Sequence, residues 1–293
     1  MKIKSQILLL LTGFFCLTGC GNNARETIKL MPFIEQQMQL GPRTPGSDAH
    51  AQFVTQTVSF LEEAGWTVQS SVERYQGKTV QNIIAERGIG NKEGQWIVIG
   101  AHFDSRIQAD QEKLSANKQK PVPAANDGAS GAAVLMGLAK TLPQMDNKRV
   151  TLAFFDAEDQ GKMMGWPDWC LGSRLLAEQY GSLERKPDAV IVIDMIGDSD
   201  LNIYRERNSD KDLTDELFRI AKKLGYTKQF IDQEKYSIYD DHVPFIEQGI
   251  PAADLIDFDY PWWHTLEDTA DKISEESLQA VYHVLFEYLS GKK

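Results

Sequence analysis

Long apolar runs alternate with segments of helical periodicity over most of the chain. Residues 95–102 form a near-continuous apolar run, which is typical of a strand buried on both faces of a sheet. Residues 149–159 and 189–198 predict two more buried strands, and residues 251–258 predict a fourth inner strand. Apolar residues at helical spacing predict helices at 51–65, 128–142, 172–180, 212–225 and 274–291.

Two further strand-like segments, 66–76 and 79–87, precede these runs, after a Gly/Pro turn at 41–47. Strands that alternate with helices predict a mostly parallel sheet with helices on both faces. We therefore expect an α/β fold with one domain, residues 27–293, in which helices flank a central, mostly parallel, twisted sheet.

The N-terminal segment has the pattern of an export signal. Positive charge in MKIK is followed by a short apolar stretch that ends in LTGC. We interpret residues 1–20 as a signal peptide. LTGC resembles the lipobox of bacterial lipoproteins, which implies that Cys20 carries lipid and that residues 21–26 are a tether. The protein is then exported and lipid-anchored to the bacterial envelope, facing the periplasm or the cell surface. The alternative is an ordinary cleaved signal with a chance cysteine.

Charge and cysteine content narrow the function. The net charge of −11 and the absence of a dense Lys/Arg run disfavour a nucleic-acid binder. Cys16 leaves with the signal and Cys20 carries lipid, so Cys170 has no cysteine partner; inert packing is favoured for it over a role as nucleophile. A monomer is expected.

Polar side chains able to bind a metal follow the apolar runs. In parallel sheets, ligands bind beyond the carboxyl ends of the strands, so we expect these side chains at one edge. Imidazole mixed with carboxylates suits zinc, and several converging carboxylates would repel one another without a cation. The candidates are His102, Asp104, Asp127, Glu158, Asp159, Asp194 and His264.

Five motifs occur in an order that carries a family resemblance: GAHFDS, PAANDGASG, FFDAED, IDMIG and WWHT. The chain resembles zinc-dependent aminopeptidases and the animal-type glutaminyl cyclases that share their three-layer fold, and LGPRTPGS near the start matches them too. The resemblance implies that Asp127, Asp159 and His264 hold zinc. The aminopeptidases hold two zinc ions, and a second ion here would draw on His102 and Asp194. The cyclases hold one.

Local features separate these two chemistries. DGASG around Asp127 resembles the aminopeptidases. The tryptophan-bearing insertion between Asp159 and Gly172, Trp263 directly before His264, and the DDHVPF run resemble the cyclases. The cyclase is the favoured interpretation, with peptides or proteins that begin with glutamine as substrates and one zinc ion. The two-zinc aminopeptidase is the alternative. A non-catalytic binding module on this fold is disfavoured because every ligand position is filled.

The resemblance also implies residue roles. Glu158 would carry a proton from the substrate amine to the leaving ammonia. Asp194 would hold the amide or the leaving nitrogen and share a proton with Asp240. His102, Asp104 and His242 would support the ligands, or a second metal.

Aromatic residues would wall the pocket and exclude water. The candidates for the wall are Trp263, Trp166 or Trp169, with Phe258 or Tyr260; the alternative is a tryptophan core or partner patch. His50 and His283 are expected at the surface or in helix packing. Asp254 stands near the position of a histidine in the cyclases, so the role of that histidine is not carried over.

Overall fold

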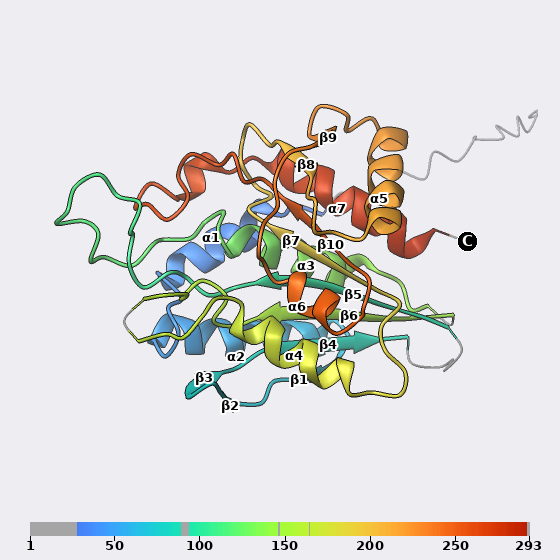
Figure 1. Ribbon diagram of the computed structural model, residues 1–293, viewed down its shortest axis with the longest axis horizontal. Helices are drawn as coiled ribbons and strands as arrows, with labels where there is room; N and C mark the ends of the chain where they lie inside the picture. The colour runs from blue at the N-terminus through green and yellow to red at the C-terminus, as the bar shows by residue number, and fades with distance from the viewer. Residues whose placement is uncertain (1–27, 89–93, 146, 164, 292–293) are drawn as a thin grey trace, which may run out of the picture.

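A six-stranded sheet forms the centre of the protein, in the strand order β1-β4-β6-β5-β7-β10 (Figure 1). The computed structural model describes residues 28–88, 94–145, 147–163 and 165–291. β5, β6, β7 and β10 run parallel, whereas β1 and β4 are antiparallel to their neighbours, so the prediction of a mostly parallel sheet is confirmed. The strands are β1 (Thr67–Gln69), β4 (Ile83–Arg87), β5 (Gln95–His102), β6 (Lys148–Phe155), β7 (Ala189–Asp194) and β10 (Ala252–Ile256).

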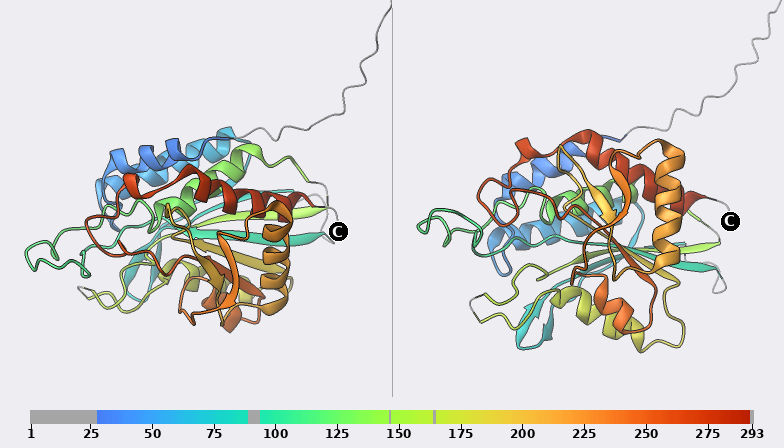
Figure 2. Two further views of the ribbon diagram at one scale, coloured as in Figure 1. Left: turned by 90° about the horizontal axis from the view of Figure 1, so that it is seen from above. Right: turned by 45° about the horizontal axis from the view of Figure 1, so that its top comes forward.

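Helices cover both faces of this sheet (Figure 2). One face carries α1 (Met31–Leu40), α2 (Asp48–Glu63), α3 (Ala129–Thr141) and α7 (Glu275–Ser290), with α5 (Lys211–Leu224) packed on α7; the other carries α4 (Leu171–Gly181) and α6 (Val243–Glu247). Alternate strand residues point to opposite faces, so Ile97 and Ile99 join the larger core while Trp96 and Val98 join the smaller one. The inner strands β5, β6 and β7 are apolar over most of their length because both of their faces are buried.

Two sequence predictions about strands change in detail. The segment 66–76 divides into β1 and β2 (Glu73–Tyr75), and β2 pairs with β3 (Lys78–Val80) in a separate hairpin. The segment 251–258 is not an inner strand, because β10 pairs with β7 alone and forms the edge. Its five residues are buried because α5, α6 and β8 (Ile203–Arg205), which pairs with β9 (Phe230–Glu234), cover it.

The predicted signal and tether, residues 1–26, lie outside the described residues. Within the described part of the chain, no helix is both long and apolar enough to cross a membrane. The parallel strands deliver their following residues to one edge of the sheet: β5 ends at His102, β7 ends at Asp194, and β6 leads into Glu158 and Asp159.

Candidate metal centre and active site

Three side chains from distant segments meet beyond the carboxyl edge of the sheet. Asp127 lies two residues before α3, Asp159 follows β6, and His264 lies in the loop after β10. Nε2 of His264 is 2.8 Å from Oδ1 of Asp159 and 3.5 Å from Oδ2 of Asp127. All three side chains are buried, and one ligand atom from each lies within 4.8 Å of the others. The structure thus brings together the three residues that the resemblance implies as zinc ligands.

The polar atoms of this triad fit a divalent cation. Oδ2 of Asp127, Oδ2 of Asp159 and Nε2 of His264 are buried and form no hydrogen bond with any described residue. Buried polar groups are normally paired, and an imidazole with two carboxylates is a donor set that zinc accepts. Burial and the charge of Asp127 raise the pKa of Asp159 to about 6, which a cation between the two carboxylates would reverse.

His102 forms a second group with the same Asp127. Its Nε2 lies 3.1 Å from Oδ1 of Asp127 and 3.2 Å from Oδ1 of Asp194, while Nδ1 is 3.5 Å from Oδ1 of Asp104. Burial would lower the pKa of His102, but these three carboxylates outweigh burial and raise that pKa well above its usual value. Gly128 lets the backbone pass close to this ring: its φ is 98°, and a Cβ there would lie 3.1 Å from Cε1 of His102.

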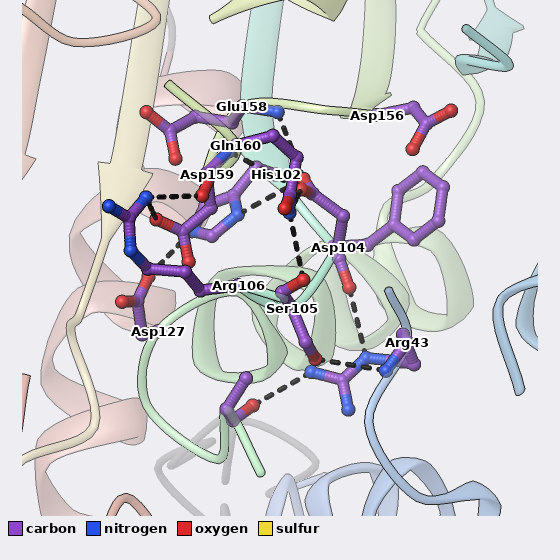
Figure 3. A network of polar contacts seen from close by, with 12 residues as sticks. Arg43, His102, Asp104, Ser105, Arg106, Asp127, Asp156, Glu158, Asp159 and Gln160 are labelled. Atoms are coloured by element: carbon purple, nitrogen blue, oxygen red, sulfur yellow. Dashed lines mark hydrogen bonds and ion pairs between the residues drawn. The ribbon is translucent and has the colours of Figure 1, made fainter. Parts of the chain in front are cut away.

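The carboxylate of Asp104 holds the backbone that carries the two neighbouring acids (Figure 3). Its Oδ1 accepts the N–H of Glu158 at 3.0 Å, and its Oδ2 accepts the N–H of Asp159 at 3.3 Å and Nε2–H of Gln160 at 2.9 Å. Ala157 has φ of 56°, in the left-handed region, so the chain turns sharply before the pair. Glu158 and Asp159 can therefore take different roles although they are adjacent in the sequence.

Two loops are tied beneath the site by Arg43, which lies in the predicted turn 41–47 (Figure 3). This fully buried side chain donates from Nε to the carbonyl of Phe103 at 2.9 Å and from Nη2 to the carbonyl of Ala124 at 2.7 Å. Burial lowers the pKa of Arg43 to about 10, although Asp268 and Asp104 oppose that shift. The guanidinium thus stays charged next to the acids.

Asp268, four residues after His264, fixes the backbone of Asp127. Its Oδ2 accepts the N–H of Asp127 at 3.1 Å, and its Oδ1 accepts the N–H of Asn126 at 2.8 Å. The hydroxyl of Tyr260 donates to the same Oδ1 at 2.7 Å. Tyr260 is therefore a buried donor to Asp268, and of the alternatives Phe258 and Tyr260 it is Phe258 that lines the pocket.

A cavity of about 520 Å³ opens beside the triad, and Glu158, Asp194 and Asp240 all lie in its lining. Burial raises the pKa of Glu158 well above its usual value; the charge of His102 opposes this and that of Asp159 adds to it. Burial also raises the pKa of Asp194 to about 7, against the opposing effect of His102. Carboxyl groups with raised pKa values suit acid–base chemistry.

Two of the expected tryptophans line this cavity and stack on the imidazole of His264. The ring centroids of Trp169 and His264 are 5.9 Å apart with an interplanar angle of 11°, and those of Trp263 and His264 are 3.8 Å apart at 26°. Phe258 extends the wall, with its ring centroid 5.5 Å from that of Trp263. The aromatic wall of the cavity thus packs directly against His264, a candidate metal ligand.

Trp166 is not part of this wall. Its ring packs near Val80, and Nζ of Lys78 lies 4.6 Å from the ring centroid. The expectation that Trp166 lines the pocket is wrong because the β2–β3 hairpin provides a separate packing surface for it.

Cys170 and His50 also contact acids near the site. Cys170 is buried as predicted, and its Sγ donates to Oε1 of Glu158 at 3.4 Å; burial and the charge of Glu158 raise its pKa well above the usual value, so it remains a thiol. His50 is not at the surface but buried, with Nε2 2.8 Å from Oδ1 of Asp156. His283 lies in helix packing, 2.5 Å from the hydroxyl of Tyr226.

His242 and Asp254 lie behind Asp240 and not in the cavity lining. One ligand atom from each of these three buried residues lies within 4.8 Å of the others. Nε2 of His242 is 3.1 Å from Oε2 of Glu206, and its Nδ1 is 3.7 Å from Oδ2 of Asp254. Burial and the charge of Asp240 raise the pKa of Asp254 well above its usual value. Asp254 therefore has a raised pKa and lies next to a candidate catalytic carboxylate.

Four polar residues of the site are absent from the candidates that the sequence provides: Arg43, Arg106, Asp110 and Asp268. Each lies in a loop and contacts its partners across long sequence separations, so periodicity gives no signal for it. The available signal is indirect, since Arg43 lies within the LGPRTPGS motif and Asp268 closely follows WWHT.

Comparisons with known proteins find a family and relatives that match most of the chain. The family described as Peptidase family M28 matches residues 82–289. Glutaminyl-peptide cyclotransferase from Boiga irregularis is 26% identical, over 85% of this chain and 77% of that relative.

Solved structures include both chemistries. The glutaminyl cyclase of Tannerella forsythia is 31% identical, with a TM-score of 0.81 over 90% of this chain and 98% of that chain. A leucine aminopeptidase precursor from Bacteroides thetaiotaomicron is 28% identical, with a TM-score of 0.83 over 90% of this chain and 97% of that one.

Proposed function

The chain belongs to peptidase family M28, and we propose that within this family it is a glutaminyl cyclase, which converts N-terminal glutamine of peptides or proteins to pyroglutamate and releases ammonia. The α-amine nitrogen bonds to the γ-amide carbon of the same residue, the bond from that carbon to the amide nitrogen breaks, and ammonia leaves. The similarity to cyclases over nearly the whole chain supports this assignment, as does the form of the cavity.

The observation that carries the proposal is the aromatic wall stacked on His264. Trp169 and Trp263 place large apolar surfaces directly beside the metal triad. Cyclisation uses no water, and water would compete with the α-amine, so a wall that excludes it favours this reaction. The same wall favours a folded glutamine side chain in which amine and amide carbon meet.

Asp127, Asp159 and His264 would hold one zinc ion. Zinc bound there supplies a Lewis acid that polarises the γ-amide carbonyl. Glu158, on the cavity lining, accepts a proton from the α-amine and delivers it to the leaving nitrogen. Asp194 and Asp240 accept hydrogen bonds from the amine and from the departing ammonia.

The two-zinc aminopeptidase is the second candidate, and one observation favours it. His102, Asp127 and Asp194 also present ligand atoms within 4.8 Å of one another, so a second ion would share Asp127 with the first. In the one-zinc enzyme that we propose, His102 instead orients Asp127 and Asp194 through the contacts described above.

Mass spectrometry on two peptides incubated with the purified protein separates these functions. One peptide begins with glutamine and the other with leucine. We expect the glutamine peptide to lose the mass of one ammonia while the leucine peptide stays intact. Removal of the first residue from the leucine peptide would contradict the cyclase and assign the aminopeptidase.

We also propose that the enzyme is exported and anchored to the bacterial envelope through lipid on Cys20. The LTGC motif supports this. A Cys20→Ala protein should incorporate no labelled fatty acid in a bacterial host, whereas the matched Cys16→Ala protein should be labelled like the wild type. Equal labelling of both variants would contradict the anchor.

A further inference from the structure

The loop between β5 and α3 carries an arginine and an aspartate that both reach the metal triad. Arg106 donates from Nε to Oδ1 of Asp110 at 2.8 Å and from Nη2 to Oδ2 at 3.1 Å, a two-point contact. From Nη1 it donates to the carbonyl of Asp159 at 2.7 Å (Figure 3). Arg106 is buried, so this contact is shielded from solvent.

Asp110 in turn contacts the imidazole of His264. Its Oδ1 lies 3.1 Å from Nδ1 of His264, the ring nitrogen that faces away from the triad; this is an ion-pair distance, and Nδ1 forms no regular hydrogen bond with a described residue. The backbone supports the same approach, since the N–H of Gln111 donates to the carbonyl of His264 at 3.3 Å.

Trp169 closes a ring of contacts. The guanidinium carbon of Arg106 lies 4.5 Å from the centroid of Trp169, whose ring stacks on His264. Arg106 therefore contacts Trp169 in the cavity wall, the backbone of Asp159, and the carboxylate of Asp110 next to His264. These four side chains, Arg106, Asp110, Trp169 and His264, are called the histidine clamp below.

We propose that Asp110 is a positioning residue for the metal centre: it accepts the Nδ1–H of His264 when a metal binds Nε2, and it is itself held by Arg106. An imidazole that binds a metal through Nε2 must carry its proton on Nδ1. A fixed acceptor at Nδ1 selects that tautomer, orients the ring and makes Nε2 a better donor. The inference rests on the proposed metal site and not on which reaction occurs there.

The test is the affinity for zinc, measured by competition with a chromophoric chelator at neutral pH. Asp110→Ala should weaken zinc binding by about 10- to 100-fold, the range found when such supporting carboxylates are removed. Asp110→Asn should show an intermediate loss, because its amide oxygen still accepts the Nδ1–H but carries no charge. Glu267→Gln is the matched control: it removes one exposed carboxylate three residues from His264 and should leave zinc binding unchanged.

Two further measurements make the outcome decisive. Nitrogen NMR of the zinc-loaded protein should show a hydrogen-bonded Nδ1–H on His264 that is lost in Asp110→Ala. Thermal melting of the zinc-free proteins checks that each variant folds; if Asp110→Ala does not, Asp110→Asn is compared alone. Unchanged zinc affinity in the folded variants would overturn the clamp, with the zinc site intact. A wild-type protein that binds no zinc would overturn the metal site and the clamp together.

Discussion

At the scale of single residues, the backbone conformation directs the side chains of the adjacent acids Glu158 and Asp159 to different places. Glu158 and Asp159 follow Ala157 in its left-handed conformation, and Asp104 accepts both of their N–H groups. Asp159 then reaches His264, while Glu158 faces the cavity. Met195 and His264 also have positive φ, of 48° and 55°, so backbone strain gathers around the site.

Because the two acids have different positions, we predict that substituting one changes turnover and substituting the other changes metal binding. Glu158→Gln keeps the size of the side chain but removes its proton acceptor, so turnover should fall by about 10²- to 10⁴-fold with zinc content unchanged. Asp159→Ala, the matched variant of the neighbouring acid, should lose zinc on dialysis. Zinc content by atomic absorption and ammonia release provide the two measurements. A fully active Glu158→Gln protein would contradict the base assignment.

A second residue-scale prediction concerns Asp254 and pH. Its folded-state pKa is raised, mainly by burial, so between the unfolded and folded pKa values the folded protein binds more protons than the unfolded one. Stability from this group is therefore present at low pH and lost as pH rises, by about 1.4 kcal/mol for each unit of raised pKa. Asn at this position cannot ionise. Asp254→Asn should thus gain stability relative to the wild type as pH increases from acid to neutral.

Urea unfolding at several pH values measures this difference. Asp212→Asn, at an exposed carboxylate on α5, is the control and should show no such trend. A wild-type advantage that grows with pH would mean that Asp254 is an anion paired with His242.

At the scale of elements, the segment between β6 and α4 carries the wall of the cavity. Trp169 lies in the cavity lining and in the histidine clamp, whereas Trp166, three residues earlier, packs against the β2–β3 hairpin. Both tryptophans belong to the insertion that resembles the cyclases, and spacing alone does not tell them apart. Their environments differ because Trp166 faces the β2–β3 hairpin and Trp169 faces the cavity.

These two tryptophans form a matched pair for substitution. Trp169→Ala should reduce kcat/KM for a glutamine peptide by roughly tenfold or more, because aromatic contacts contribute about 0.5–1.5 kcal/mol beyond buried area and 1.36 kcal/mol is a factor of ten in rate. Trp166→Ala should lower the melting temperature but leave kcat/KM near the wild-type value. Steady-state kinetics with zinc content measured in parallel test this. Equal losses in both variants would contradict the assigned wall.

How well the sequence predicts each strand depends on how the strand is buried. β5, β6 and β7 have apolar residues on both faces, so periodicity identifies them, and the edge rule for parallel sheets then gives His102, Asp159 and Asp194. β10 is equally buried although it contains Asp254, yet it forms the edge, because helices and β8 cover it as neighbouring strands would. Arg106 and Asp110 were not predictable because their partners are fixed only by the folded loops.

At the scale of the whole molecule, the proposed zinc ion would join segments that are far apart in sequence. Asp127, Asp159 and His264 lie in three different loops at the carboxyl edge of the sheet. Asp268, in the same loop as His264, accepts the N–H of Asp127 and so links two of these loops. A ligand that binds only the folded state stabilises it, by about 4 kcal/mol when its free concentration is 1,000 times Kd. The metal is therefore expected to support the fold as well as the chemistry.

Chelation of the metal should consequently lower the melting temperature, by roughly 2–4 °C for each kcal/mol lost in a chain of this size. Burial lowers the pKa of His264, but Asp159 and Asp110 outweigh burial and raise that pKa to about 9 in the protein without metal. Below pH 9 zinc must displace this proton, so zinc binding should release about one proton and weaken about tenfold for each unit by which pH falls.

The stabilisation by zinc should therefore shrink as pH decreases from 9 toward 7, at constant free zinc. Differential scanning calorimetry with and without chelator, at several pH values, measures it, and titration calorimetry in buffers of different ionisation enthalpy counts the protons. Asp159→Ala serves as the control, since it should melt at the same temperature with and without zinc. A chelator effect of constant size across this pH range would mean that His264 is neutral in the metal-free protein, and that the surrounding carboxylates hold it less strongly than their distances indicate.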